Sequence, residues 1–116
     1  MNARSRVSRD PDAGGVRHDD LDRAIHEPGR LVLMASLYVV ERADFIFLRK
    51  QTGMTGGNLS SHMTKLEEAG YVAVTKRFVG KRPQTLFALT KKGRSAFEKY
   101  RGTMEDLLRT AGREKR

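Results

Sequence analysis

The residues whose types and spacing could do chemistry are cations gathered in one short segment. Four of them lie around a glycine and a proline between positions 76 and 83, namely Lys76, Arg77, Lys81 and Arg82. Like charges held this close repel one another, so the segment is best used against an anion. Lys and Arg bind phosphate oxygens, and a basic turn can also enter the minor groove of DNA. The segment predicts contacts with DNA, with Arg82 as the groove residue; a solvated charge run is the alternative.

A second set of candidate residues is small and polar. If residues 55–69 form a helix, Leu59, Met63 and Leu66 share one face through their i, i+4 and i+7 spacing, and this face predicts a core contact. The opposite face and its edges carry Thr55, Gly57, Asn58, Ser60, Ser61, Thr64 and Lys65. Short polar side chains let a helix approach base edges and offer them donors and acceptors. We expect this face to bind DNA, with an ordinary solvated face as the alternative.

Metal and catalytic chemistry have few candidates. The chain has no cysteine, which excludes disulfides and thiolate ligands, and its histidines, His18, His26 and His62, are widely separated. His62 lies beside the predicted core face, where we expect a structural role. No phosphate-binding glycine motif and no cluster of carboxylates is present. We therefore expect neither an enzyme nor a bound metal or cofactor.

The charge of the whole chain favours a polyanionic partner. The sequence has 23 Lys+Arg against 14 Asp+Glu, a formal net charge of +9 on 116 residues. Such a surface attracts phosphate before any specific contact forms. An anionic membrane would require a helix with a basic and an apolar face, which is not how these cations are arranged. Residues 1–20 contain no apolar run, and the longest apolar stretch, 31–40, is about half of a membrane span. We expect a soluble, cytoplasmic protein.

The elements that must position these residues fit in one domain. Residues 1–18 predict a disordered basic arm and residues 111–116 a polar tail, which leaves a domain at 19–110. A short helix is expected at 21–26, before Pro28, and an almost wholly apolar helix at 30–41.

Two further helices follow, joined by a short turn. Asp44 is a candidate N-cap for the first and Gly53 a candidate end, while Thr55 can cap the second, which Gly70 ends. Two helices joined in this way predict a helix-turn-helix.

After Gly70 the apolar period becomes two, at 72–75 and again at 85–89, which predicts a β-hairpin with the basic segment at its turn. Thr90 can cap a last helix. An apolar stripe on that helix predicts a dimer interface, together with two residues near the start of the domain: Phe97, Tyr100, Met104, Leu107 and Leu108, with Leu21 and Ile25.

The amino-acid sequence resembles those of bacterial winged helix-turn-helix regulators related to the MarR and ArsR families. The resemblance lies in Asp44-Phe45 and in segments 59–63, 66–72, 78–85 and 89–94, and it extends over roughly residues 21–108. It implies a mainly α fold with a β-hairpin wing and extra N- and C-terminal helices. It also implies a homodimeric regulator of transcription that binds double-stranded DNA at an inverted repeat, with its third helix in the major groove. The absence of cysteine disfavours metal sensing, and no effector follows from the sequence.

An alternative interpretation is that the chain has the winged helix fold but does not bind DNA. A winged helix can serve as a protein-interaction module, but a basic wing beside a small, polar third helix favours DNA.

Overall fold

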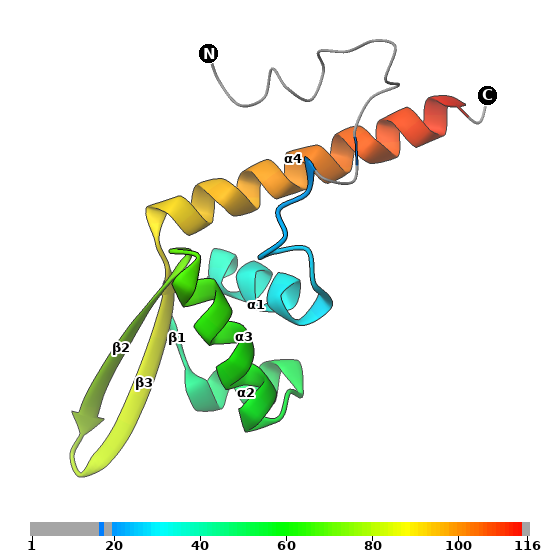
Figure 1. The fold of residues 1–116 in the computed structure, drawn as a ribbon. Coiled ribbons are helices and arrows are strands. Elements are labelled where there is room, and N and C mark those ends of the chain that lie inside the picture. Colours follow the sequence, from blue (N-terminus) through cyan, green and yellow to red (C-terminus); the bar gives the residue numbers. More distant parts are fainter. Residues whose placement is uncertain (1–16, 18–19, 115–116) are drawn as a thin grey trace.

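The structure, a computed structural model, describes residue 17 and residues 20–114 (Figure 1). The expected basic arm, residues 1–18, lies outside the described residues except for Arg17. Helices and strands follow in the order α1 (Pro28–Val39), β1 (Ala43–Asp44), α2 (Phe45–Thr52), α3 (Gly56–Glu68), β2 (Val72–Val79), β3 (Arg82–Leu89) and α4 (Lys91–Glu114). The mainly helical chain with a β-hairpin confirms the predicted winged helix-turn-helix fold.

The segment before α1 differs from the prediction. Residues 21–26 form turns instead of a helix. The Asp22 carboxylate accepts hydrogen bonds from the backbone N–H groups of Ala24 and Ile25, at 2.9 and 3.3 Å, and so offers the backbone an alternative to helical bonding. Because a segment this short also cannot offset the cost of helix nucleation, the turns prevail.

Helix α1 begins two residues earlier than expected. Pro28 occupies its first turn, where its fixed φ suits a helix and its missing N–H costs nothing. Glu27 is the N-cap and accepts a hydrogen bond from the Arg30 N–H at 2.8 Å. That bond is the main reason why the pKa of the Glu27 carboxyl is lowered. The helix ends at Val39, before the predicted residue 41, as the chain extends toward β1.

The helix-turn-helix is built as predicted. The Asp44 carboxylate accepts from the Phe47 N–H at 2.7 Å and caps α2, which ends where Gly53 adopts a φ of 75°. The Thr55 hydroxyl accepts from the Asn58 N–H at 3.1 Å and caps α3. A residue with a side chain rarely adopts such a positive φ, so Gly53 allows the sharp turn between the two helices.

The sheet is antiparallel, with β3 between β1 and β2. Strands β2 and β3 form the wing, in a register that pairs Val72 with Leu89 and Val79 with Arg82. Strand β1 pairs Ala43 with Phe87. The sequence did not predict β1, because two residues are too few to show an alternating pattern.

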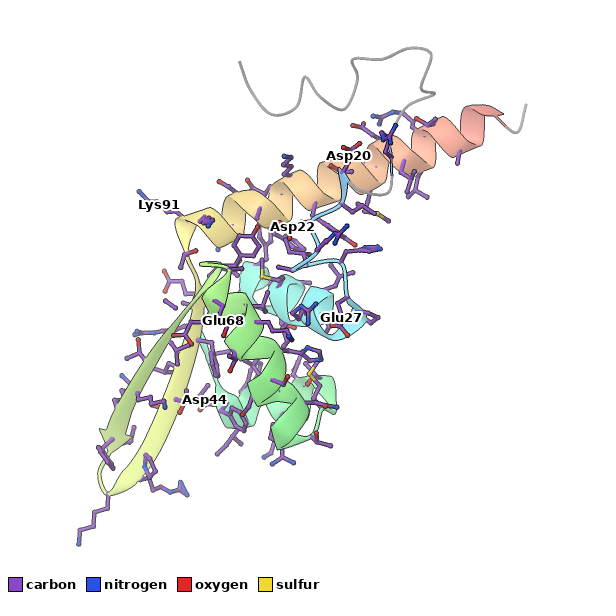
Figure 2. All side chains as sticks on the ribbon, in the orientation of Figure 1. Asp20, Asp22, Glu27, Asp44, Glu68 and Lys91 are labelled. Carbon is purple, nitrogen blue, oxygen red and sulfur yellow. The ribbon has the colours of Figure 1, made fainter. Side chains whose placement is uncertain are left out.

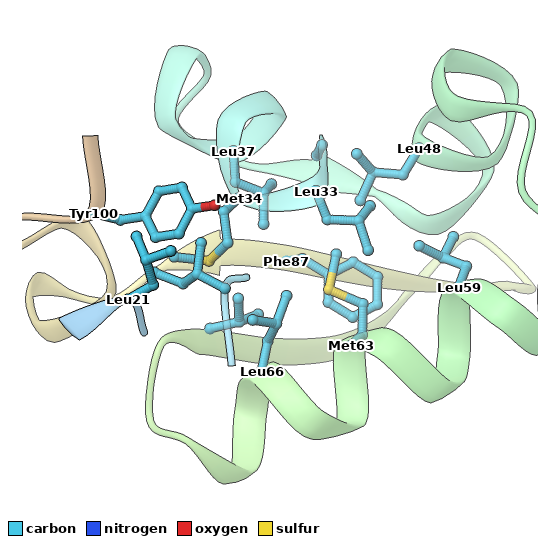
Figure 3. Close-up of a cluster of buried hydrophobic side chains, with 13 residues drawn as sticks. Leu21, Leu33, Met34, Leu37, Leu48, Leu59, Met63, Leu66, Phe87 and Tyr100 are labelled. Carbon is cyan, nitrogen blue, oxygen red and sulfur yellow. The ribbon is translucent and has the colours of Figure 1, made fainter. Parts of the chain in front are cut away.

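The core lies where α1, α3 and the base of the wing meet (Figure 3). Helix α3 contributes Leu59, Met63 and Leu66, as predicted, and all three are buried. They pack in one cluster with residues of the other elements, including Leu33, Met34, Leu37, Leu48, Val72, Phe87 and Tyr100. Burial of each large apolar side chain stabilises the fold by about 2 kcal/mol.

Helix α4 begins against the base of the wing. Thr90 caps it, because its hydroxyl accepts from the Gly93 N–H at 2.9 Å. The Tyr71 hydroxyl, just before β2, donates to Asp22, and burial together with this bond raises the pKa of Tyr71 to about 12.

Helix α4 continues through residues 111–114, which the sequence pattern assigns to a polar tail. No helix in the described ranges is long and apolar enough to cross a membrane.

Gly93 gives a test of this packing. A Cβ at Gly93 would overlap the carbonyl oxygen of Tyr71, whereas a Cβ at Gly102, on the same helix, would meet no atom within 4 Å. We expect Gly93→Ala to lower the free energy of unfolding by about 2 kcal/mol. Gly102→Ala, the matched control, should raise it by up to about 1 kcal/mol through helix propensity. Urea unfolding measures both, and equal effects of the two variants would contradict the packing.

Candidate nucleic-acid interface

The outer face of α3 is open to solvent over its whole length. Because Leu59, Met63 and Leu66 are buried, the opposite side of the helix must point outward. All seven predicted residues of this helix and its cap are exposed: Thr55, Gly57, Asn58, Ser60, Ser61, Thr64 and Lys65. The structure thus brings them together on one accessible surface, which we call the α3 face.

The wing carries the predicted cations beyond the body of the domain. Lys76, Arg77, Lys81 and Arg82 are all exposed. A two-residue turn joins the strands, and Gly80 supplies the positive φ of 64° that hairpin turns of this length use. The wing tip and the N-terminal end of α3 lie at the same end of the molecule, opposite α4 (Figure 1). One large ligand can therefore contact both.

Hydrogen bonds join the wing to the helix-turn-helix. The Arg77 Nε donates to the Gln84 side-chain oxygen at 2.8 Å, and the Gln84 side-chain nitrogen donates to the Asp44 carboxylate at 3.1 Å. Asp44 in turn caps α2. This Asp44–Gln84–Arg77 chain uses one edge of the guanidinium and leaves its terminal nitrogens available to a ligand.

Sequence reasoning missed Gln84. The signal is the strand register, in which Gln84 lies directly across from Arg77. Residues that face each other in an antiparallel pair are close enough for their side chains to bond.

The acidic residues of α3 lie at its far end. Glu67 and Glu68 are exposed in the last turn, and Figure 2 places Glu68 near the base of the wing, away from its tip. Arg49 and Lys50 are exposed in the last turn of α2, which leads to the N-terminal end of α3. The end of the domain that carries the wing tip is therefore the more cationic one.

His62 has the structural position that we expected. Its Nδ1 lies 3.7 Å from the Glu27 carboxylate and 3.5 Å from a terminal nitrogen of Arg30, both at the start of α1. A Cβ at Gly29 would lie 2.5 Å from the imidazole Nε2, so glycine permits this close approach. His62 therefore packs α3 against α1.

The predicted dimer surface is partly wrong. Leu21, Ile25 and Tyr100 are buried in the core of the single chain and offer no free surface. The prediction placed Leu21 and Ile25 on a short helix beside the apolar stripe of the last helix, but the turns at 21–26 fold them into the core. Phe97 and Met104 also pack against the core, although each remains partly accessible. This leaves two apolar residues farther along α4, Leu107, which is half-buried, and Leu108, which is 66% exposed.

The described part of the chain contains no candidate metal site. No group of three or more His, Asp or Glu side chains there could hold a metal ion.

The fold and these surfaces match a known family. A profile of the winged helix DNA-binding domain matches residues 30–108. This match takes in all but the first two residues of α1, the helix-turn-helix, the wing and most of α4. The chain belongs to the winged helix DNA-binding domain family.

Individual proteins are also similar to this chain. An uncharacterised protein of Methanocaldococcus jannaschii is 39% identical over 71 residues, which make up 61% of this chain and 77% of that protein. A transcriptional regulator homologue from Pyrococcus horikoshii OT3 has a similar structure, with a TM-score of 0.71 and 28% identity over 75% of this chain and 86% of its own. The structure of ytfH from Salmonella typhimurium shares the fold, with a TM-score of 0.62 and 17% identity over 81% of this chain and 87% of its own.

The Asp44–Gln84–Arg77 chain predicts a coupling between two side chains in DNA binding. Gln84→Ala should weaken binding about fivefold, because Arg77 loses the bond that orients it. The double variant with Arg77→Ala should bind no more weakly than Arg77→Ala alone. Thr75→Ala, at an exposed position of the same hairpin, is the control. Fluorescence anisotropy with a labelled duplex measures all four variants, and additive losses would contradict the coupling.

Proposed function

We propose that the protein is a transcriptional regulator that binds double-stranded DNA with sequence specificity. The α3 face enters the major groove, and the wing contacts the phosphate backbone and the adjacent minor groove. The observation that carries the proposal is that the exposed, polar α3 face and the cationic wing tip lie at the same end of the molecule (Figure 1). The Pyrococcus horikoshii relative, described as a transcriptional regulator homologue, supports it. The protein acts in the cytoplasm, without catalysis.

The shape of the α3 face suits a base-reading role. A major groove is about 12 Å wide and admits one helix. Ser61 and Asn58 offer hydrogen-bond donors and acceptors on short side chains, and Gly57 removes bulk near the helix start. The free N–H groups of that first turn favour an anion, which on DNA is a phosphate.

A homodimer completes the proposal. One recognition helix reads only a few base pairs, whereas two related by a two-fold axis read an inverted repeat with half-sites about one helical turn apart. Leu107 and Leu108 lie on the distal part of α4, at the end of the molecule away from the wing tip, where a second copy would not obstruct DNA.

The α3 face is tested by adding charge to it. Ser61→Glu and Asn58→Glu should each abolish specific binding to a duplex selected from a random library, because a carboxylate faces the DNA. Folding should be unchanged, since both residues are exposed. Thr75→Glu, on the wing, separates a general charge effect from impaired base recognition, because it should weaken all duplexes alike. Anisotropy measures affinity, and wild-type affinity in both α3 variants would refute the placement.

The wing is tested through salt. Changing Lys81 and Arg82 together to Ala should weaken binding to every sequence and reduce the slope of log K against log salt by about two units, one for each phosphate that is no longer neutralised. The double variant Lys91→Ala with Lys99→Ala, in α4, removes the same charge away from the proposed interface. Its slope should stay near the wild-type value. An equal reduction in both variants would mean that only net charge matters.

The dimer is tested on α4. Leu107→Glu with Leu108→Glu should yield a folded monomer that binds an inverted repeat poorly, because buried carboxylates oppose association. Lys99→Glu, at an exposed position of the same helix, should leave the dimer intact. Sedimentation at micromolar concentration measures both. A monomeric wild-type protein with the affinity of the double variant would refute the dimer.

A further inference from the structure

The tip of the wing carries apolar side chains that the body of the protein does not cover. Phe78 is 72% exposed and Val79 is 54% exposed, next to the Gly80 turn. Phe78 lies directly across the hairpin from Pro83, which is also exposed. An exposed ring forgoes the free energy that burial of a Phe supplies elsewhere. Phe78 and its partner Pro83 share one face of the hairpin, whereas Val79 projects from the other, so the exposed ring and proline form an adjacent apolar pair rather than scattered single residues.

The charges around this tip select its partner. Four exposed cations flank the apolar residues, namely Lys76, Arg77, Lys81 and Arg82, and no acidic residue occurs between positions 71 and 97 of the sequence. An apolar pocket on a protein would desolvate those cations without pairing them unless acidic side chains lined its rim. A minor groove has phosphates on both walls and base edges on its floor, and a base-pair step that opens there exposes the apolar faces of its bases. Proteins that bind there insert Phe or Pro between base steps.

The Phe78 ring also lies on the face of the hairpin that packs against α3 at its base. Side chains alternate along β2, so Phe78 lies on the same face as Val72 and Val74. This is the face that packs in the core with α3. A duplex that receives α3 in its major groove would pass this side of the wing.

We propose that Phe78 is a wedge that enters the minor groove beside α3 and partly unstacks one base-pair step. Pro83 supports the ring, and the cations hold the phosphates on either wall. Pyrimidine–purine steps are the easiest to open, so the wedge adds a preference for TA or CA/TG without a hydrogen bond to a base. This inference rests on the proposed function, which requires the wing at DNA but not insertion.

The wedge is tested by unstacking. The probes are duplexes that the full chain selects from a random library, each carrying 2-aminopurine at one flanking position. Saturating wild-type protein should raise the fluorescence about twofold or more at one step beside the α3 site, as expected for an unstacked base. Phe78→Ala should abolish the rise and weaken binding about tenfold. Phe78→Leu should keep a smaller rise, and Thr75→Ala should change neither quantity.

The other outcomes overturn the wedge, and one of them overturns the proposed function as well. If the wild-type complex leaves fluorescence unchanged at every flanking position, the wedge is overturned while the proposed function stands. If Phe78→Ala keeps the full rise, or changes the sedimentation of the free protein instead, the ring has another role and the wedge is again overturned. If the wild-type chain selects no duplex, both proposals fail. Thermal melting of Phe78→Ala, which alters an exposed side chain, checks that the fold is retained.

Discussion

Burial of one face of α3 is the constraint on which the rest of the structure depends. Leu59, Met63 and Leu66 are its only large apolar residues, and all three lie in the core with α1 and the base of the wing. Truncation of one such leucine costs about 3 kcal/mol, a large part of the stability of a domain this small. Because the helix cannot rotate without exposing these side chains, its polar side is held outward. The orientation of the α3 face is thus a consequence of packing.

The wing is held by the same core and by polar links. Val72 and Phe87 anchor the base of the hairpin, and β1 adds a third strand beside β3. Asp44 joins these parts, because its carboxylate caps α2 and also accepts from Gln84, which bonds Arg77. The reach of the wing relative to α3 is therefore set by residues that need not contact the ligand. In such an arrangement, affinity depends on preorganisation as well as on charge.

Much of the fold could be predicted from local signals. Capping residues and helix ends, such as Asp44, Thr55 and Gly53, act within a few positions of themselves, so the sequence displays them directly. Strand β1 and the burial of Tyr100 depend instead on contacts between distant segments. Asp22 illustrates the difference, because its bond to Tyr71 joins residues far apart in the chain. The candidate site shows the same difference. The cations of the wing could be predicted from the sequence, but the role of Gln84 required the strand register.

We propose that the α3 face and the wing together form the DNA-binding surface. Amide chemical shifts of the full chain, titrated with a duplex selected from a random library, test it most directly. We expect the largest changes in residues 55–65 and 76–84, with small changes in the distal half of α4 beyond those caused by association. Large changes confined to α4, with residues 55–65 unaffected at saturation, would contradict it.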